Sequence, residues 1–181
     1  LNFAVGGAPT QTLTVPVVGD LIVEATETAT LNLGAVSNTA GVTTITDGSG
    51  LLTINDDDSA VVTFNPVSVS QTEALSPMAF TVTLSNPVQS GVSLTLTSAT
   101  GTATAPADFT AITAGTVSFP ANSNTTQTVN VAIANDALDE DDESFTLTLS
   151  GLAATGSVTL DSATATGIVQ DDDALPALSV A

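Results

Sequence analysis

The chain contains two copies of one sequence pattern, and this internal repeat limits the folds open to it more than any other feature. Residues 10–33, TQTLTVPVVGDLIVEATETATLNL, align without a gap on residues 126–149, TQTVNVAIANDALDEDDESFTLTL, at an offset of 116. Each copy then runs through a short apolar segment to three aspartates, beginning at Asp56 and at Asp171 with an offset of 115. A unit that recurs in this way folds as a module that packs beside its neighbours.

The repeat divides the chain into three parts. Residues 1–58 correspond to the C-terminal half of one unit, residues 59–173 form a complete unit, and residues 174–181 match the first strand of a following unit. The last match rests on Leu178-Ser179-Val180, which aligns with Val62-Thr63-Phe64. We therefore expect the chain to be a piece of a longer tandem array.

Apolar and polar residues alternate through both copies. Phe80, Val82 and Leu84 fall on one face of a strand, and the threonines between them fall on the other. This pattern predicts an all-β, antiparallel two-sheet β-sandwich (immunoglobulin-like) of about seven strands with no helix. The phenylalanines expected in its core are Phe64, Phe80, Phe119 and Phe145. The predicted strands are 60–64, 67–70, 79–85, 92–98, 116–119, 125–133, 144–150 and 161–169, with a strand at 12–18 in the partial copy that contains Pro16 and is therefore expected at an edge.

The charged residues are all acidic and are clustered. The 181 residues include 19 Asp and Glu but no Lys, Arg or His. Carboxylates follow or precede predicted strands at Glu73, Asp108, 136–143 and 171–173. Because a sandwich gathers its loops at its two ends, four acidic loops can converge there. Cations from solution must neutralise such a cluster, and a hard, oxygen-preferring ion such as Ca²⁺ is the natural candidate.

The missing residue types exclude most other chemistry. Without Cys, His, Lys or Arg there is no thiolate, no ordinary zinc site, no Schiff base and no basic surface for nucleic acid. Asp108 and Glu140 could form an acid–base pair, but no aromatic platform or basic residue is present to hold a substrate, so we do not expect an enzyme. Residues 74–107 are uncharged, yet polar residues interrupt them throughout, so no membrane span is expected.

Four motifs together resemble the Calx-β domain, the calcium-binding module of sodium–calcium exchangers and of large bacterial surface proteins. They are GTATAPADF at 101–109, VSFPAN with TQTVNVAI within 117–133, NDALDEDDESFTLTL at 135–149 and IVQDDD at 168–173. The resemblance implies a set of calcium ligands in the complete unit and a second set in the partial unit. These are Glu73, Asp108, Asp136, Glu140, Asp171, Asp172 and Asp173, and then Asp20, Glu24, Asp56, Asp57 and Asp58.

The other acidic residues have a simpler interpretation. An acidic run is usually a solvated surface, and we expect this of Asp139, Asp141 and Asp142. Glu143 and Glu27 are ambiguous and could support a loop from behind the ligands. One departure from the family pattern is that Asn135 and Gly19 stand where calcium-sensing members carry an acidic residue.

Three functions remain open at this point. The first is a calcium-stiffened structural repeat of a long extracellular adhesin, stalk or filament, located at a cell surface of bacterial type and contacting neighbouring repeats. The second is a regulatory calcium sensor, and the third is a ligand-binding module of a surface protein. Calcium affinity separates the first two, because extracellular modules bind at about 10⁻⁴–10⁻³ M and sensors at about 10⁻⁷–10⁻⁵ M.

Overall fold

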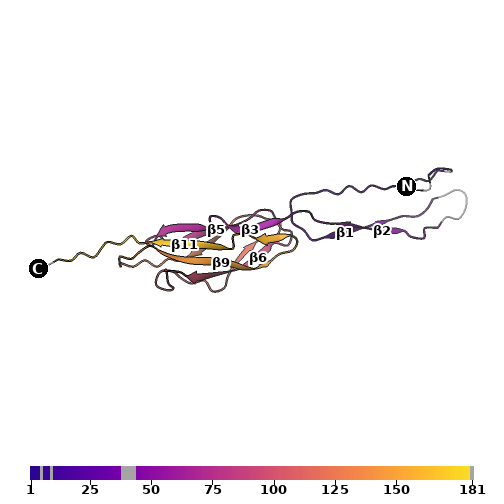
Figure 1. The fold of residues 1–181 in the computed structure, drawn as a ribbon. Helices are drawn as coiled ribbons and strands as arrows, with labels where there is room; N and C mark the ends of the chain where they lie inside the picture. The colour runs from indigo at the N-terminus through magenta and orange to yellow at the C-terminus, as the bar shows by residue number, and fades with distance from the viewer. Residues whose placement is uncertain (5, 9, 38–43, 180–181) are drawn as a thin grey trace. The chain divides into compact units, whose positions relative to one another are not determined.

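The computed structural model describes residues 1–4, 6–8, 10–37 and 44–179, and this part of the chain is all β with no helix. It separates into two compact units (Figure 1). Unit 1 comprises Leu1–Asp20 with Thr28–Ile54, and unit 2 comprises Leu21–Glu27 with Asn55–Ala181. Unit 2 therefore contains the complete copy together with short segments of the partial one.

Unit 2 is a sandwich of two sheets. One sheet has the order β10-β3-β5-β8 and the other the order β4-β11-β9-β6-β7. The strands of the first sheet are β3 (Ala60–Phe64), β5 (Met78–Leu84), β8 (Gln127–Val131) and β10 (Val158–Leu160). Those of the second are β4 (Ser68–Thr72), β6 (Val92–Thr100), β7 (Gly115–Phe119), β9 (Glu143–Ala153) and β11 (Thr164–Gln170).

The predicted two-sheet sandwich is confirmed, with two differences in detail. The described part of unit 2 has nine strands rather than about seven, since its sheets hold four and five. In addition, β10 pairs with β3 and β11 pairs with β4 in parallel, whereas the other neighbours are antiparallel. The short β10 was not predicted because its alternation, Val158-Thr159-Leu160, covers only three residues between Gly, Ser and Asp.

The core lies between the two sheets and uses the predicted alternation. Phe80, Val82 and Leu84 are buried, as are Phe64, Phe119 and Phe145. Phe109 is also buried, although it lies outside any strand, and its ring stacks on that of Phe145 with centroids 4.4 Å apart.

The described residues of unit 1 contain one pair of strands, β1 (Glu27–Asn32), whose first residue belongs to unit 2, and β2 (Ser49–Ile54). The register matches that of the complete copy, because Leu33 N–H donates to Gly48 O at 2.7 Å and its counterpart Leu149 donates to Ala163 O at 2.8 Å. The internal repeat is thus present in the backbone as well as in the sequence.

Two predicted strands are not formed in the described residues. Residues 12–18 form none, and their counterpart explains why: β8 pairs with β5, and residues 1–58 contain no counterpart of β5. Residues 174–179 also form no strand, and Val180 and Ala181 lie outside the described residues. A separate observation is that no helix long and apolar enough to cross a membrane occurs in the part of the chain described.

Candidate metal centre

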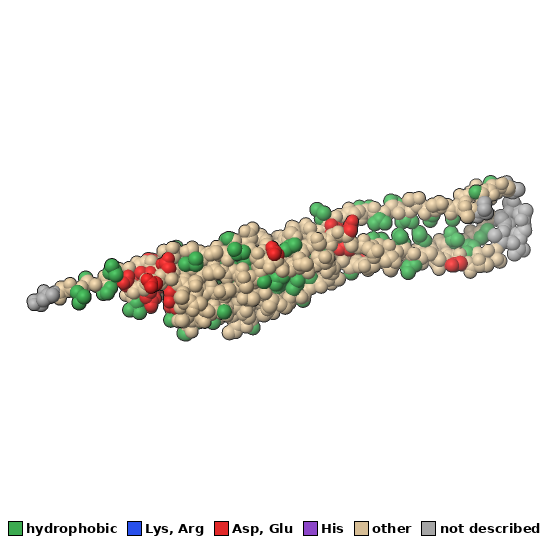
Figure 2. Space-filling view, in the orientation of Figure 1, with side chains coloured by type: hydrophobic (Ala, Val, Ile, Leu, Met, Phe, Trp, Pro, Cys, Tyr) green, Lys and Arg blue, Asp and Glu red, His purple; other side chains and the backbone are tan. Residues whose placement is uncertain are grey.

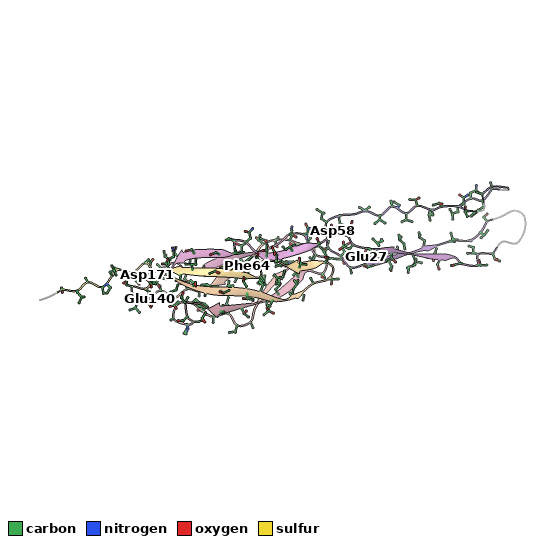
Figure 3. The ribbon with its side chains drawn as sticks, in the orientation of Figure 1. Glu27, Asp58, Phe64, Glu140 and Asp171 are labelled. Carbon is green, nitrogen blue, oxygen red and sulfur yellow. The ribbon has the colours of Figure 1, made fainter. Side chains whose placement is uncertain are left out.

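Most carboxylates of unit 2 gather at one end of the sandwich. Figure 2 shows this concentration of acidic side chains, and Figure 3 places Glu140 and Asp171 at that end and Asp58 at the other. The acidic end is built by the segment after β4, the loop between β6 and β7, the loop between β8 and β9 and the segment after β11. The predicted convergence of four loops therefore occurs.

The first group of carboxylates consists of Glu73, Asp171 and Asp173. One oxygen from each lies within 4.8 Å of the others. Parallel pairing brings them together: Thr72 of β4 lies opposite Gln170 of β11, so both strands end at the same edge. One further hydrogen bond extends this pairing, from Glu73 N–H to Gln170 O at 3.0 Å.

The oxygens of this group are buried without partners. Glu73 is only 7 % exposed, and Glu73 Oε1, Asp171 Oδ1 and Asp173 Oδ2 accept no hydrogen bond. Burial raises the pKa of Glu73 to about 7, and the adjacent Asp173 carboxyl and the charges of Asp136 and Asp171 add to the effect. Ionised carboxylates only accept hydrogen bonds, so a proton or a cation must stand between these oxygens.

The second group consists of Asp108, Glu140 and Glu143, again with one oxygen from each within 4.8 Å. Burial raises the pKa of Glu143 to about 7, with further contributions from Asp108 and Glu140. Desolvation also raises the pKa of Glu140, and the charges of Asp136, Asp108, Asp171 and Asp173 act in the same direction. The four charges acting on Glu140 include two from the first group, so the two groups form one electrostatic site.

Backbone contacts hold several of these carboxylates in place. Asp108 Oδ2 accepts hydrogen bonds from Thr104 N–H at 2.6 Å and from the Thr104 hydroxyl at 3.2 Å. Asp136 Oδ1 accepts from Leu138 N–H at 2.7 Å. The loop that carries Asp108 approaches β9 very closely at Gly101, where an added Cβ would lie 2.5 Å from the Ser144 carbonyl oxygen. Glycine is therefore required at position 101.

The remaining acidic residues of this end have different positions. Asp136 acts on both Glu73 and Glu140 through its charge, whereas Asp172 is exposed and belongs to neither group. Asp142 Oδ1 accepts a hydrogen bond from Asp171 N–H at 3.3 Å, so it holds the closing segment. Glu143 enters the second group directly, and its place as the first residue of β9, opposite Val169, accounts for this.

A small depression lies over both groups. Glu73, Asp108, Glu140, Glu143 and Asp171 line it together with Asp141 and Val169. A larger depression, about 380 Å³, opens beside Ser90, Phe119 and Thr155, but its lining contains no charged side chain. The acidic depression is therefore the one with the chemistry of a cation site.

The carboxylates of the partial copy are arranged differently. Asp56 Oδ2 accepts a hydrogen bond from Glu24 N–H at 3.1 Å, which places these two residues side by side in unit 2. Among the described residues, Asp20, Glu24, Asp56, Asp57 and Asp58 do not form a group of three within 4.8 Å. The counterparts of Glu73 and Asp108 would belong to the front half of the unit, which residues 1–58 do not include.

Comparisons with known proteins agree with this architecture. The family model of the Calx-beta domain matches residues 1–58 and 55–173. A crystal structure of the apo-form Calx CBD1 domain is 25 % identical with a TM-score of 0.58, and the match covers 63 % of this chain and 98 % of that one. The crystal structure of CBD12 from CALX1.2 is also 25 % identical, with a TM-score of 0.57, and the match covers 62 % of this chain and 46 % of that one.

A third structure, the Calx CBD2 domain, shares the fold with a TM-score of 0.56 at 13 % identity, over 62 % of this chain and 86 % of that one. No curated protein is significantly similar to the chain. The family model accounts for both copies of the internal repeat, and the chain belongs to the Calx-beta domain family.

Proposed function

We propose that the chain is a calcium-binding structural repeat of a long extracellular adhesin, stalk or filament protein. The observation that carries this proposal is the trio of buried, unpartnered oxygens on Glu73, Asp171 and Asp173. Three such oxygens within 4.8 Å, in a chain without Lys, Arg or His, fit an oxygen-coordinated divalent cation.

The donor set favours Ca²⁺ over other ions. All donors are oxygens, and Ca²⁺ accepts about 6–8 of them in irregular geometry, whereas Mg²⁺ requires a near-regular octahedron. Glu73, Asp171 and Asp173 would hold one ion and Asp108, Glu140 and Glu143 another, with Asp136 between them. A relative whose title reads calcium binding domain CBD12 of CALX1.1 is consistent with this assignment.

The ion would act by joining separate chain segments. The two groups draw their carboxylates from the ends of β4 and β11, from the start of β9 and from two loops. Without a cation these carboxylates repel one another at the strand ends, and with it they become cross-links. Binding to the folded state alone also raises its stability by mass action, by about 2.7 kcal/mol when free calcium is 100 times the Kd.

The same reasoning extends to the partial copy. Glu24 and Asp56 are adjacent in unit 2, so an ion held by them together with Asp57 and Asp58 would stiffen the segments that lead into the next repeat. Because the described carboxylates of this copy form no group of three within 4.8 Å, we expect weaker binding here than at the complete site.

The alternative is a regulatory calcium sensor, and affinity distinguishes it from a structural repeat. Asn135 and Gly19 stand beside Asp136 and Asp20, where the resemblance implies an acidic residue in calcium-sensing members, and fewer carboxylates lower the affinity. We therefore expect a Kd of about 10⁻⁴–10⁻³ M, as in extracellular modules. A Kd near or below about 10⁻⁶ M would favour the sensor.

Calorimetric titration of the full chain with CaCl₂, after treatment with a chelator, tests the proposal. Saturable binding should occur, and Asp171→Asn should weaken the strongest site. Asp161→Asn is the matched control, because Asp161 is an exposed aspartate between β10 and β11. No binding up to millimolar calcium, or equal losses in the two variants, would contradict the proposal.

Stiffening requires its own measurement. Small-angle scattering of a protein with two complete repeats should give a longer maximum dimension and less flexibility in calcium than in chelator. Identical scattering under both conditions, with calcium binding established by titration, would remove the mechanical role while leaving the site.

A further inference from the structure

The end of unit 2 opposite the acidic site is occupied by a short segment of the partial copy. Val23 is fully buried there and forms a parallel bridge with Val88. Val23 N–H donates to Pro87 O at 2.9 Å, and Gln89 N–H donates to Val23 O at 2.9 Å. One residue of the preceding copy is thus added to the complete sandwich as a strand would be.

The surface that receives Val23 is shaped for it. Gly156 has φ +82°, and a Cβ at this position would lie 2.6 Å from Val23 Cγ1 and 2.8 Å from the Glu24 carbonyl oxygen. Gln89 Nε2 donates to Glu24 Oε1 at 3.0 Å. We call Pro87, Val88, Gln89 and Gly156 the socket, because together they enclose an apolar side chain and contact the carboxylate that follows it.

The two acidic loops of the chain differ at the position that the socket receives. In the internal alignment Val23 corresponds to Asp139, whereas Glu24 corresponds to Glu140. Asp139 and Glu140 are exposed at the acidic end, and Leu138 beside them is 62 % exposed. The loops therefore share the carboxylate but not the buried residue.

We propose that the socket is a recognition surface between repeats, and that its occupant is the acidic loop of the preceding repeat. The socket selects a loop that has an apolar residue three positions after its first aspartate and a glutamate directly after that, as Val23 and Glu24 follow Asp20. An aspartate at the apolar position would have to be buried without a cation, which is costly. A loop of the Asp139 type is therefore rejected, so the two loops of this chain are not interchangeable. This selection goes beyond calcium binding and operates without an ion.

Amide hydrogen exchange of the full chain, measured by NMR in chelator and again in calcium, tests the proposal. The amides of Val23 and Gln89 should be protected in both conditions. Val23→Asp, which copies the second loop, should lower their protection by at least about tenfold, because a buried Val side chain contributes that much to a local opening equilibrium. Leu21→Asp is the matched control, since Leu21 is 64 % exposed two positions away.

A control measurement and a second variant show whether the loss of protection is local. Amides in the centre of β9 should stay protected in Val23→Asp, which shows that the sandwich remains folded. If they do not, Val23→Thr, with the same shape and one hydroxyl, should reduce protection only at Val23 and Gln89. Equal protection in Val23→Asp and Leu21→Asp, or unprotected amides in the unmodified chain, would overturn the socket. Neither result depends on whether calcium binds.

Discussion

Glu73 shows at the scale of a residue why a bound cation would stabilise this fold. It is the only charged side chain among the buried residues of the described chain, and its neighbours Asp171 and Asp173 are also acidic. A buried carboxylate without a donor destabilises the folded state, and two like charges add to this. The three carboxylates thus destabilise the folded state by themselves, and the proposed ion would offset this cost.

Glu73→Gln should separate these two effects. In chelator the variant should be more stable than the unmodified protein by roughly 1–3 kcal/mol, because the amide removes a charge and can donate to Asp173. In calcium the order should reverse, since one ligand is lost. Thermal unfolding in both conditions gives the comparison, with Asp161→Asn as the control. A destabilised variant in chelator would mean that the carboxylate has a partner in solution.

Proton binding provides a second prediction at this scale. Burial raises the pKa of Glu73 and of Glu143 from 4.5 to about 7 in the folded state. Between these values the folded chain binds more protons than the unfolded chain, so stability without calcium should fall as the pH rises from about 5 to about 7.5. With calcium the added stability should instead shrink as the pH falls, because protons compete for the ligands. Melting temperatures measured at about pH 5 and about pH 7.5, with and without calcium, test both expected trends.

Sequence spacing could predict the acidic loops but not how their side chains divide into groups. Glu73, Asp108 and Asp171 follow recognisable strands or motifs, so their convergence was accessible. Glu143 was ambiguous because its direction depends on where β9 begins, and the pairing with Val169 sets this. Phe109 was missed because an irregular segment has no alternation, and its burial depends on the distant ring of Phe145.

At the scale of elements, the two copies differ in which strand of a pair carries the large side chain. Phe145 of β9 lies opposite Gly167 of β11, and an added Cβ on Gly167 would lie 2.4 Å from the Phe145 ring. The aligned residues in β1 and β2 are Ala29 and Leu52. The large side chain is therefore on the first strand of the pair in one copy and on the second strand in the other. This indicates that each strand pair can accommodate only one large side chain at this position.

Gly167→Ala should therefore destabilise unit 2 by about 1–3 kcal/mol through overpacking. The change should cost less when Phe145→Leu is already present, because the smaller side chain leaves room for the new methyl group. Chemical unfolding of the two single variants and the double variant gives the coupling energy. Additive effects would show that the ring and the glycine do not constrain each other.

Strands were predictable from the sequence where the apolar–polar alternation is long. They were less predictable where formation of the strand depends on a partner strand. The limits of β3, β5 and β6 follow the alternating residues closely. Residues 12–18 alternate as well, yet they form no strand in unit 1, because backbone pairing needs a partner that local sequence does not supply. The parallel β10 is the converse case, since its three residues favour a strand but are too few to predict one without the partner β3.

For the molecule as a whole, the two copies differ in burial. Leu13, Leu31 and Leu33 are 59 %, 38 % and 50 % exposed in unit 1. Their counterparts in unit 2, Val129, Leu147 and Leu149, are 8 %, 0 % and 2 % exposed. The aligned apolar residues thus contribute far less hydrophobic stabilisation in unit 1.

Hydrogen exchange should expose this difference directly. Amides at 28–33 should exchange faster than their counterparts at 144–149 by several orders of magnitude, because the described residues of unit 1 include no buried apolar side chain to oppose opening. The internal repeat makes this a comparison of aligned segments, TATLNL at 28–33 and SFTLTL at 144–149, which share three of six residues. Equal protection of the two segments would mean that another surface covers unit 1 in solution.

The strand order of unit 2 has a consequence for a repeat under tension. The chain enters through β3 at the socket end and leaves through β11 at the acidic end, and these strands belong to different sheets. A pulling force would slide β11 lengthwise against both β4 and β9, so the hydrogen bonds of two ladders would share the load and break together instead of opening one after another. The carboxylates after β4 and β11 lie where that sliding begins. A cation bound there would cross-link the ends of β4 and β11 and resist this sliding. Dissociation of the ion would then set the force at which the repeat unfolds.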